Sequence, residues 1–285
     1  MPSESLILAP AAHVVVRDSH SVQCGIDARR AGIVEVAHPR AVAAALAGAR
    51  RATPRPEIVE RLRAAGLPRL AAASLVGELV EYRVLRRADA DRAPITVLGS
   101  SRLARLAAAL LREDGLAVRR PPGGSPGDAH GLHSLHDLCG PVLLVDSATQ
   151  YGRLVPALLR HCPTVLPALL LGAHGVIGPT RIEGAGPCPV CYVLHRNEED
   201  PRWYRVLTQV TDPGHGPSLH ATAARLSACG AWLAGAAPEP PGHPGMALGP
   251  GEVLSIDPYR AAGMERRAAL RPHPRCVLCG REGGG

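Results

Sequence analysis

Two Cys-x-x-Cys pairs are the residues of this sequence whose types and spacing point most directly to chemistry. Cys188 and Cys191 form the first pair, and Cys276 and Cys279 form the second. Two thiolates separated by two residues in a tight turn can both point at one ion, and two such turns supply the four soft ligands of a tetrahedral zinc site. Because four thiolates leave no coordination position open, the sequence predicts a zinc ion that stabilises the fold and does not catalyse.

The distance between the pairs excludes the small zinc modules, which place the second pair about 15 to 20 residues after the first. Here residues 192–275 separate the pairs, so the metal would join the middle of a domain to the end of the chain. Two unrelated buried pairs remain an alternative. A redox site is another, although a thioredoxin-type Cys-x-x-Cys occurs once, at the start of a helix. The other cysteines are isolated and expected to be small buried hydrophobes: Cys24, Cys139, Cys162 and Cys229.

A candidate nucleotide loop follows a predicted strand. The segment APITVLGSSRLARLAAALLREDGLAVRR (93–120) indicates a strand, a turn, a long helix and a second strand. In nucleotide-binding units this turn carries Gly-x-Gly-x-x-Gly, because phosphates approach bare backbone at the helix N-terminus. The corresponding positions are Gly99, Ser101 and Ala104, and the second strand ends in AVRRPP, with no acidic residue for a ribose. We therefore expect that ATP binds weakly or not at all.

Two further groups of polar residues have both a functional and a structural interpretation. Asp146 ends a predicted strand, where open α/β sheets place functional groups, and an aspartate satisfied within its own turn is the equal alternative. His130, His133 and His136 recur every three residues in the loop 119–137. No Cys or carboxylate pattern accompanies them, so we expect solvated loop histidines and not a metal site.

Composition bounds the function classes. The chain of 285 residues has a net charge of +7, and its 32 basic residues are all arginine. An Arg-, Ala-, Gly- and Pro-rich composition without lysine is the actinobacterial type expected of a GC-rich genome, so the charge is weak evidence for a nucleic-acid partner. Two Trp, five Tyr and no Phe also leave few aromatic side chains on which bases could stack. Without a long apolar span or a basic leader, the sequence predicts no membrane insertion and a cytoplasmic protein with reduced thiols.

The length suggests two domains, 1–90 and 91–285, divided at the polar linker RADADRAP (87–94). Three strand patterns followed by three helical patterns predict a small antiparallel sheet and a winged-helix-like module in the first domain: 13–18, 21–27, 31–37, 39–51, 56–66 and 70–87. The second domain is expected to continue as a buried strand, a helix, one or two strands, two more helices and a long irregular connection: 141–147, 150–161, 164–179, 200–210, 218–236 and 236–252.

The helix predicted over 70–87 opens with small and apolar side chains, carries arginines only at its far end, and places Leu75, Leu79, Tyr82 and Leu85 on one stripe. A winged helix that binds DNA needs polar and basic side chains there. Peptide capture instead pairs an extended segment with a sheet edge beside a helix. We favour peptide capture over packing against the second domain, and both over DNA. The candidate edge residues and groove walls are Ile33, Val34, Val36, Ala72, Leu75, Val76 and Leu79. A proline at Val34 is expected to remove a donor from the edge.

These motifs together resemble a known family. The degenerate turn, the VLLVDS strand, the run GPCPVCYVLHRNEEDPRW (186–203) and the terminal HPRCVLCG (273–280) are similar to the ThiF-like, ubiquitin-activating-enzyme-like fold. More narrowly, Cys-x-x-Cys-x-x-x-His-Arg followed by Asp-Pro-x-Trp resembles the ThiF-like cyclodehydratase-associated, leader-peptide-binding proteins of azol(in)e-containing peptide biosynthesis, also called the bacteriocin-biosynthesis cyclodehydratase family. The resemblance spans nearly the whole chain, and its N-terminal part matches a RiPP recognition element only in its strand and helix pattern.

The resemblance implies an α/β protein in which a winged-helix-like peptide-recognition module precedes a degenerate Rossmann-like ThiF-type domain with a structural zinc. It places the zinc on the four paired cysteines and carries over no catalytic residue. It implies a non-catalytic scaffold that binds a ribosomal precursor (leader) peptide and presents it to a YcaO-type cyclodehydratase, which uses ATP to form azolines. A homodimer is compatible with it.

The alternative function is an active ThiF-like adenylyltransferase that acts on the C-terminus of a carrier protein. Active members of the family stabilise the transferring phosphoryl group with a basic pair that includes a lysine, and this chain has no lysine. Removing one preorganised charge donor typically costs on the order of 100- to 1,000-fold in rate. The sequence therefore leaves its status as an enzyme open and favours no activity of the chain by itself outside a cyclodehydratase complex.

Overall fold

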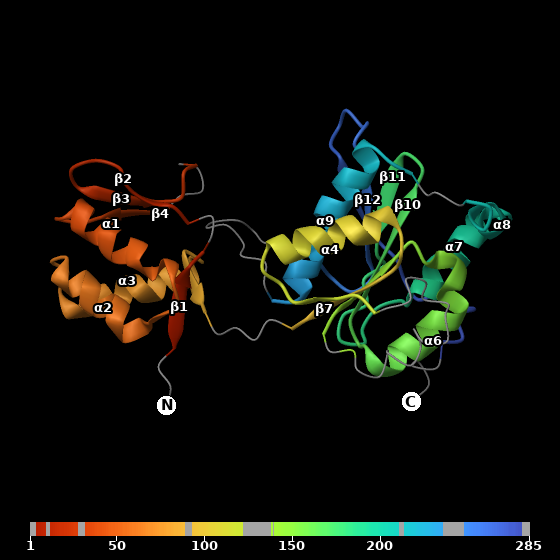
Figure 1. Ribbon diagram of the computed structural model, residues 1–285, viewed down its shortest axis with the longest axis horizontal. Coiled ribbons are helices and arrows are strands. Elements are labelled where there is room, and N and C mark those ends of the chain that lie inside the picture. Colours follow the sequence, from red (N-terminus) through yellow and green to blue (C-terminus); the bar gives the residue numbers. More distant parts are fainter. Residues whose placement is uncertain are drawn as a thin grey trace. The chain divides into compact units, whose positions relative to one another are not determined.

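The computed structural model describes the following residues: 4–9, 12–27, 32–88, 93–121, 138, 140–210, 214–235 and 248–280. They form two compact units, one within residues 4–88 and the other within 93–280 (Figure 1). His130, His133, His136 and Cys139 lie outside the described residues. Within the described part of the chain, no helix has the length and apolar character that a membrane span requires.

The first unit combines two small antiparallel sheets with three helices. One sheet, in the order β2–β3–β4, consists of β2 (Val14–Val16), β3 (Ser21–Cys24) and β4 (Gly32–Glu35). The other, in the order β5–β1–β6, consists of β5 (Thr53–Pro54), β1 (Ser5–Leu8) and β6 (Leu85–Arg87). The helices are α1 (Pro39–Ala47), followed by the short helix η1 (Gly48–Arg50), α2 (Arg55–Ala64) and α3 (Arg69–Glu81). The first sheet confirms the three strands predicted before α1, and the second sheet was not predicted.

The local sequence explains where these helices begin. Prolines stand in the first turns of α1 and α2, where a missing N–H removes no intrahelical hydrogen bond. Apolar side chains at helical spacing, such as Val42 and Leu46 of α1 or Ile58 and Leu62 of α2, are fully buried. Figure 1 shows the β2–β3–β4 sheet over α1, which packs against β2 and β3.

The prediction of one helix over 70–87 is wrong at its C-terminal end. The helix ends at Glu81, Arg83 adopts a left-handed φ of 63°, and the chain then enters β6. Leu85 therefore leaves the predicted stripe and pairs with Leu8 of β1. The apolar spacing was compatible with either structure, and a strand partner from the distant N-terminal segment decides for the strand. Glu4 reinforces this pairing through ion pairs with Arg55 and Arg87.

The second unit is built on a seven-stranded mixed sheet in the order β13–β12–β11–β10–β9–β7–β8. The strands β8, β7, β9 and β10 are mutually parallel, and β11, β12 and β13 continue the sheet as antiparallel neighbours. Their bounds are β7 (Ile95–Leu98), β8 (Val118–Arg119), β9 (Val142–Val145), β10 (Val165–Leu171), β11 (His174–Ile177), β12 (Glu252–Ile256) and β13 (Glu265–Ala269). This mixed α/β architecture confirms the predicted fold class at that level.

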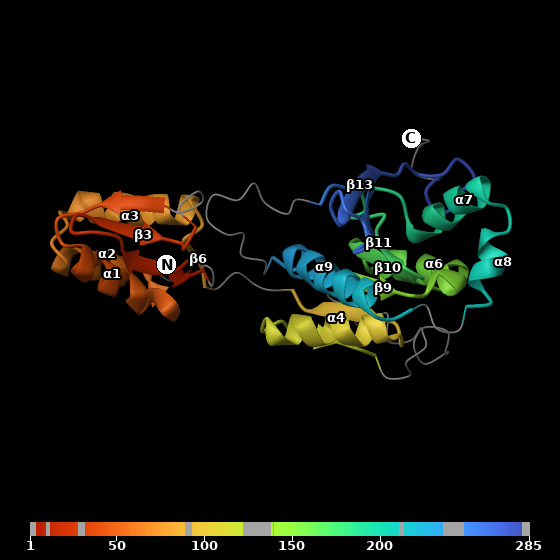
Figure 2. The same ribbon diagram turned by 90° about the horizontal axis from the view of Figure 1, so that it is seen from above.

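Helices cover both faces of this sheet. Their bounds are α4 (Arg102–Glu113), α6 (Tyr151–His161), preceded by the short helix η3 (Ala148–Gln150), α7 (Pro189–Glu199), α8 (Trp203–Leu207) and α9 (Pro217–Leu233). Figure 1 shows α4 and α9 on one side of the strands and α6 and α7 on the other, and α4 and α9 lie side by side in Figure 2 as well. The inner parallel strands β7, β9 and β10 consequently read as largely apolar runs, because both of their faces are buried.

The two C-terminal strands were missed. The sequence predicts an irregular connection over 236–252 and assigns no structure to the residues directly after it, whereas β12 begins at Glu252 and β13 pairs with it. All five residues of β13 are exposed, so the strand has no alternation of buried and exposed side chains that could signal it. Its formation depends on the neighbouring strand.

Candidate functional site

The structure brings the four paired cysteines together in the second unit. The Sγ atom of Cys188 lies 3.9 Å from that of Cys191 and 3.5 Å from that of Cys276, and the Sγ atoms of Cys191 and Cys279 lie 3.6 Å apart. All four residues are buried. Zinc–sulfur bonds of about 2.3 Å in a tetrahedron place the sulfurs about 3.8 Å apart. This group, which we call the four-cysteine cluster, therefore has the composition and dimensions of a four-thiolate metal site.

Local backbone structure aims the thiols at one point. Cys188 is the N-cap of α7, Pro189 occupies the first helical position, and Cys191 lies in the first turn. Cys276 and Cys279 lie in a turn near the C-terminus, closed by a hydrogen bond from the Gly280 N–H to the Cys276 carbonyl. The Cys188 N–H donates to the Cys279 Sγ, at 3.3 Å, so backbone as well as side chains link the two pairs.

Electrostatics within the four-cysteine cluster favour thiolates with a shared counter-charge. Hydrogen bonding from Cys188, followed by the backbone N–H of His273, lowers the pKa of Cys191 to about 5 against the opposing effect of burial. The hydrogen bond to Cys191, together with burial, raises the pKa of Cys188, and burial raises that of Cys279 to about 11. Burial thus opposes ionisation of Cys188 and Cys279, and a divalent metal would supply the charge that compensates for it.

A second group of polar residues, which sequence reasoning missed, fastens the C-terminal pair to α7. The buried side chain of His273 places Nε2 3.0 Å from Oε1 of Glu198, and Arg275 donates to the same oxygen at 2.9 Å. The N–H of Arg275 donates to Nδ1 of His273, so the proton of the neutral ring lies on Nε2, toward Glu198. The backbone N–H of His273 in turn contacts the Sγ of Cys191 at 3.4 Å.

His195 completes this arrangement, and we call His195, Glu198, His273 and Arg275 the Glu198 clamp. The His195 ring packs edge-on against that of His273, with centroids 4.7 Å apart, and its Nε2 lies 3.0 Å from the carbonyl oxygen of Arg271. Each histidine therefore has one ring nitrogen in a hydrogen bond with the backbone. The sequence signal that could have located the clamp is the His-Arg-x-Glu run shortly after the first Cys-x-x-Cys.

Three of the isolated cysteines are buried hydrophobes, as expected from the sequence. Cys24, Cys162 and Cys229 are at most 1% exposed. Burial raises the pKa of Cys24 and of Cys229 to about 11 in each case. Neither thiol is therefore activated as a nucleophile.

The candidate nucleotide loop forms the bend predicted between β7 and α4. Gly99 has a φ of +143°, and a Cβ at this position would meet the carbonyl oxygen of Val145 at 2.5 Å, so the glycine serves the close approach of β9. Ser101 is the N-cap of α4, and its Oγ accepts from the N–H of Ala104 at 3.1 Å. Arg120, just after β8, donates to the carbonyl of Gly99. The Ser101 side chain thus occupies a backbone N–H that a phosphate cradle would offer.

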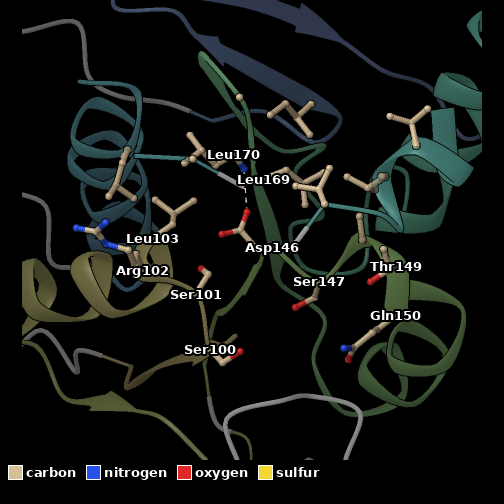
Figure 3. Close-up of a pocket in the computed structure, with 18 of the residues that line it drawn as sticks. Ser100, Ser101, Arg102, Leu103, Asp146, Ser147, Thr149, Gln150, Leu169 and Leu170 are labelled. Carbon is tan, nitrogen blue, oxygen red and sulfur yellow. Dashed lines mark hydrogen bonds between the residues drawn. The ribbon is translucent and has the colours of Figure 1, made fainter. Parts of the chain in front are cut away.

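A cavity of about 640 Å³ lies at the C-terminal ends of β7, β9 and β10, next to this loop (Figure 3). Asp146 faces it with a left-handed φ of 47°, held by hydrogen bonds from its N–H to Ala168 and from the Leu170 N–H to its Oδ1. Figure 3 shows Ser101 beside Asp146. Burial raises the pKa of the Asp146 carboxyl, although hydrogen bonding from Ser101 and Leu170 opposes the shift. Oδ1 of Asp146 therefore accepts a hydrogen bond from the backbone. Its buried Oδ2 accepts none with acceptable geometry from the described residues.

A groove of about 450 Å³ lies in the first unit between β4 and α3. Ala71, Ser74, Leu75 and Glu78 line it from α3 at the i, i+3, i+4 and i+7 spacing of a single helix face. Residues 34–38 and the α2–α3 connection at 65–68 complete the lining. Because β4 has a described neighbour only on its β3 side, the groove runs beside the edge of a sheet.

The residues predicted to surround this groove separate into three groups. Val34, Val36 and Leu75 line it. Ala72, Val76 and Leu79 are buried in the core beneath it. Ile33 is 48% exposed and lies on the opposite face of β4, because successive strand residues alternate. The register of the strand, which the sequence did not fix, decides this division.

Comparison with known proteins identifies solved structures of the same fold. No protein-family model and no curated protein matches this chain. The heterocyclase TruD superposes with a TM-score of 0.59 at 17% identity, over 97% of this chain and 43% of that chain. Another heterocyclase, solved in complex with substrate and cofactor, gives a TM-score of 0.58 at 16% identity, over 97% and 40%. E. coli MccB with succinimide gives a TM-score of 0.54 at 12% identity, over 97% and 99%.

This chain therefore spans less than half the length of the two heterocyclase chains and nearly all of MccB. At such low identities the likeness concerns the fold alone. The chain has the mixed α/β fold that it shares with the heterocyclase TruD and with MccB.

Proposed function

We propose that this chain is a non-catalytic scaffold that binds a ribosomal precursor peptide along β4 and presents it to a YcaO-type cyclodehydratase for azoline formation. The observation that carries the proposal is the edge of β4, which has no second neighbouring strand among the described residues, beside a lined groove in the first unit. Extended peptides commonly bind by adding a strand to such an edge, with alternate side chains entering the groove. The four-cysteine cluster holds a structural zinc in this proposal and keeps the second unit folded.

The register of β4 supports strand addition. The Val36 N–H donates to the carbonyl of His20 on the β3 side, and residues 32–35 continue this antiparallel pairing. Hydrogen-bonded and non-hydrogen-bonded pairs alternate in such a ladder, so Val34 also bonds to β3, whereas the backbone groups of Ile33 and Glu35 point away from it. The expectation that a proline at Val34 removes an edge donor is thereby corrected, because the edge donors belong to Ile33 and Glu35.

The neighbours in fold support the biosynthetic setting. TruD is a heterocyclase, a second heterocyclase was solved in complex with substrate and cofactor, and E. coli MccB was solved with SeMet MccA. This chain matches less than half of each heterocyclase. In the proposal a YcaO-type cyclodehydratase supplies the ring-forming activity.

Filling the groove tests the peptide site. Ala71 is an exposed groove residue, and Ala73 is an exposed residue of the same helix outside the groove. In fluorescence polarisation with the precursor peptide encoded nearest the gene, Ala71→Trp should weaken binding at least tenfold, because the indole occupies space that peptide side chains need. Ala73→Trp should bind as the wild type does. Equal affinities of the two folded variants would place the peptide elsewhere, and a wild type that does not bind would refute the proposal.

The second candidate function is an adenylyltransferase, favoured by the cavity of about 640 Å³ at the strand ends beside α4. Open α/β sheets bind ligands at this location, and E. coli MccB, a neighbour in fold, has been solved with ATP. The capped start of α4 and the absence of lysine argue against it here. Exchange of pyrophosphate into ATP, or a micromolar dissociation constant for Mg-ATP in calorimetry, would promote this candidate over the scaffold.

A further inference from the structure

The groove between β4 and α3 is acidic, in contrast to the chain that carries it. Two acidic residues border it, and we call them the groove carboxylates: Glu78 of α3 on the groove face, and Glu35 of β4, whose side chain lies on the outer face of the strand edge. No arginine is among the described lining residues. The whole chain has a net charge of +7. A peptide that enters this groove therefore meets carboxylates on an otherwise basic protein.

The two groove carboxylates also lack the ion pairs that other acidic residues of the first unit make. Glu4, Glu57 and Glu60 each pair with an arginine, at 2.6 to 3.2 Å. Glu78 accepts a hydrogen bond from the Ser74 hydroxyl at 3.1 Å, and Glu35 has no partner within the described residues. Both side chains are exposed, and neither makes an ion pair with a described residue.

Strand geometry places the two carboxylates on opposite faces of any strand added to β4. Side chains of an added strand alternate between the outer face, beside Ile33 and Glu35, and the groove face, beside Leu75 and Glu78. Adjacent residues of the peptide would therefore each face one glutamate. Both faces also offer an apolar contact, through exposed Ile33 outside and Val34 with Val36 inside.

We infer that the groove selects an extended peptide in which apolar residues flank a pair of adjacent basic residues, one for Glu35 and one for Glu78. This inference rests on the proposed peptide-binding function and adds the chemical class of its ligand. Opposite charges across a strand pair attract and like charges repel, so an acidic segment in the same position is disfavoured. Each exposed pair should change affinity by only about two- to fivefold, because water and salt screen it.

Three fluorescein-labelled decapeptides of the same apolar sequence test the inference, with their two central residues both Arg, both Gln or both Glu. At about 20 mM salt the Arg peptide should bind about tenfold tighter than the Glu peptide, with the Gln peptide between them, and the spread should shrink at about 200 mM salt. Glu35→Gln and Glu78→Gln should each reduce the preference for Arg over Gln by about two- to fivefold. Glu60→Gln, which alters an exposed glutamate paired with Arg63, is the matched control and should leave it unchanged.

The outcomes separate this inference from the proposal beneath it. Equal binding of the three peptides, or tighter binding of the Glu peptide, would overturn the charge preference while peptide binding stands. A preference for Arg that survives both groove variants would place the selective carboxylates elsewhere and also overturn it. Failure of all three peptides and of the precursor peptide to bind would refute the peptide-binding function, and the inference with it.

Discussion

The four-cysteine cluster and the β4 edge differ in whether their polar groups have partners within the described chain. In the four-cysteine cluster, buried thiols converge within contact distance, and the Glu198 clamp and backbone N–H groups fix them from outside. At β4, backbone groups of Ile33 and Glu35 point away from the described sheet, beside a groove whose carboxylates make no ion pair with other described residues. Polar groups that are partnered within the chain, which we call the closed side of this comparison, stabilise the fold. Polar groups without a partner in the described chain, which we call the open side, can bind another molecule.

The largest expected effect breaks the closed side of this comparison. Purified protein should contain one zinc per chain, and Cys276→Ser should leave the second unit unfolded or insoluble. Structural zinc can supply roughly 10 to 16 kcal/mol of apparent binding energy, against a total stability of roughly 5 to 15 kcal/mol. Elemental analysis and circular dichroism measure both. Cys229→Ala, which removes a buried thiol outside the four-cysteine cluster, should keep its zinc, and well under half an equivalent of zinc in the wild type would refute the metal assignment.

A smaller effect on the closed side is expected from a change in the Glu198 clamp that leaves the four cysteines unchanged. Glu198→Gln should weaken zinc affinity by about 10- to 100-fold, as changes in outer-shell partners do, and so accelerate release of the metal to a chelator, because a neutral amide is a weaker acceptor for His273 and Arg275. Cobalt substitution should still give the absorption spectrum of four thiolates, which shows that the ligands are intact. Glu199→Gln, which disturbs a pair with Arg196 instead, is the control, and identical release rates for the two variants would contradict a role of the Glu198 clamp.

The open side can be tested through its backbone alone. Ile33→Pro should weaken binding of the precursor peptide by about tenfold, because it removes an N–H that points away from β3. Ile33→Ala keeps this donor and should lose less than about threefold, because it removes only one exposed side-chain contact. Fluorescence polarisation of the two variants, after circular dichroism has shown both to be folded, separates backbone pairing from side-chain contact. Similar losses in both would mean that the edge donors do not bind peptide.

The smallest predicted effect concerns the loop between β7 and α4, whose Ser101 side chain caps the helix. Ser101→Ala should lower stability by about 1 kcal/mol, because the N–H of Ala104 loses its capping oxygen. For a unit of this size that corresponds to a melting temperature lower by about 2 to 4 °C in calorimetry. Ser100→Ala, one residue earlier, removes a hydroxyl that caps nothing in the described structure and should change little. An unchanged melting temperature for Ser101→Ala would mean that the cap by the Ser101 side chain does not stabilise α4.

The sequence allowed the four-cysteine cluster to be predicted because its signal is short and strong. Two residues between cysteines fix a local turn, and only the meeting of the two turns had to be inferred. The missing glycines of the loop between β7 and α4 could be seen in the sequence equally well, because they are a local property. The Glu198 clamp was less legible, because Glu198 and His273 are brought together only when α7 meets the C-terminal turn.

The errors arose where a distant partner decides between two locally allowed structures. Residues 85–87 fit a helix by spacing and became a strand because β1 pairs with them. Residues 265–269 carry no apolar pattern and became a strand because β12 pairs with them. The edge donors of β4 were assigned to the wrong residue for the same reason, since strand register is a property of the pair and not of one strand.

By itself, the sequence determined the identity of the paired thiols, the absence of two of the three glycines from the loop between β7 and α4, and the α/β alternation of the second unit. These rest on residue types at short spacings, where local geometry leaves little choice. Tertiary structure alone decided which backbone groups of β4 remain open and which side chains line the groove beside α3. It also decided that the Glu198 clamp closes over the four-cysteine cluster. Such features depend on contacts between residues far apart in the chain, and those contacts exist only after the elements have packed.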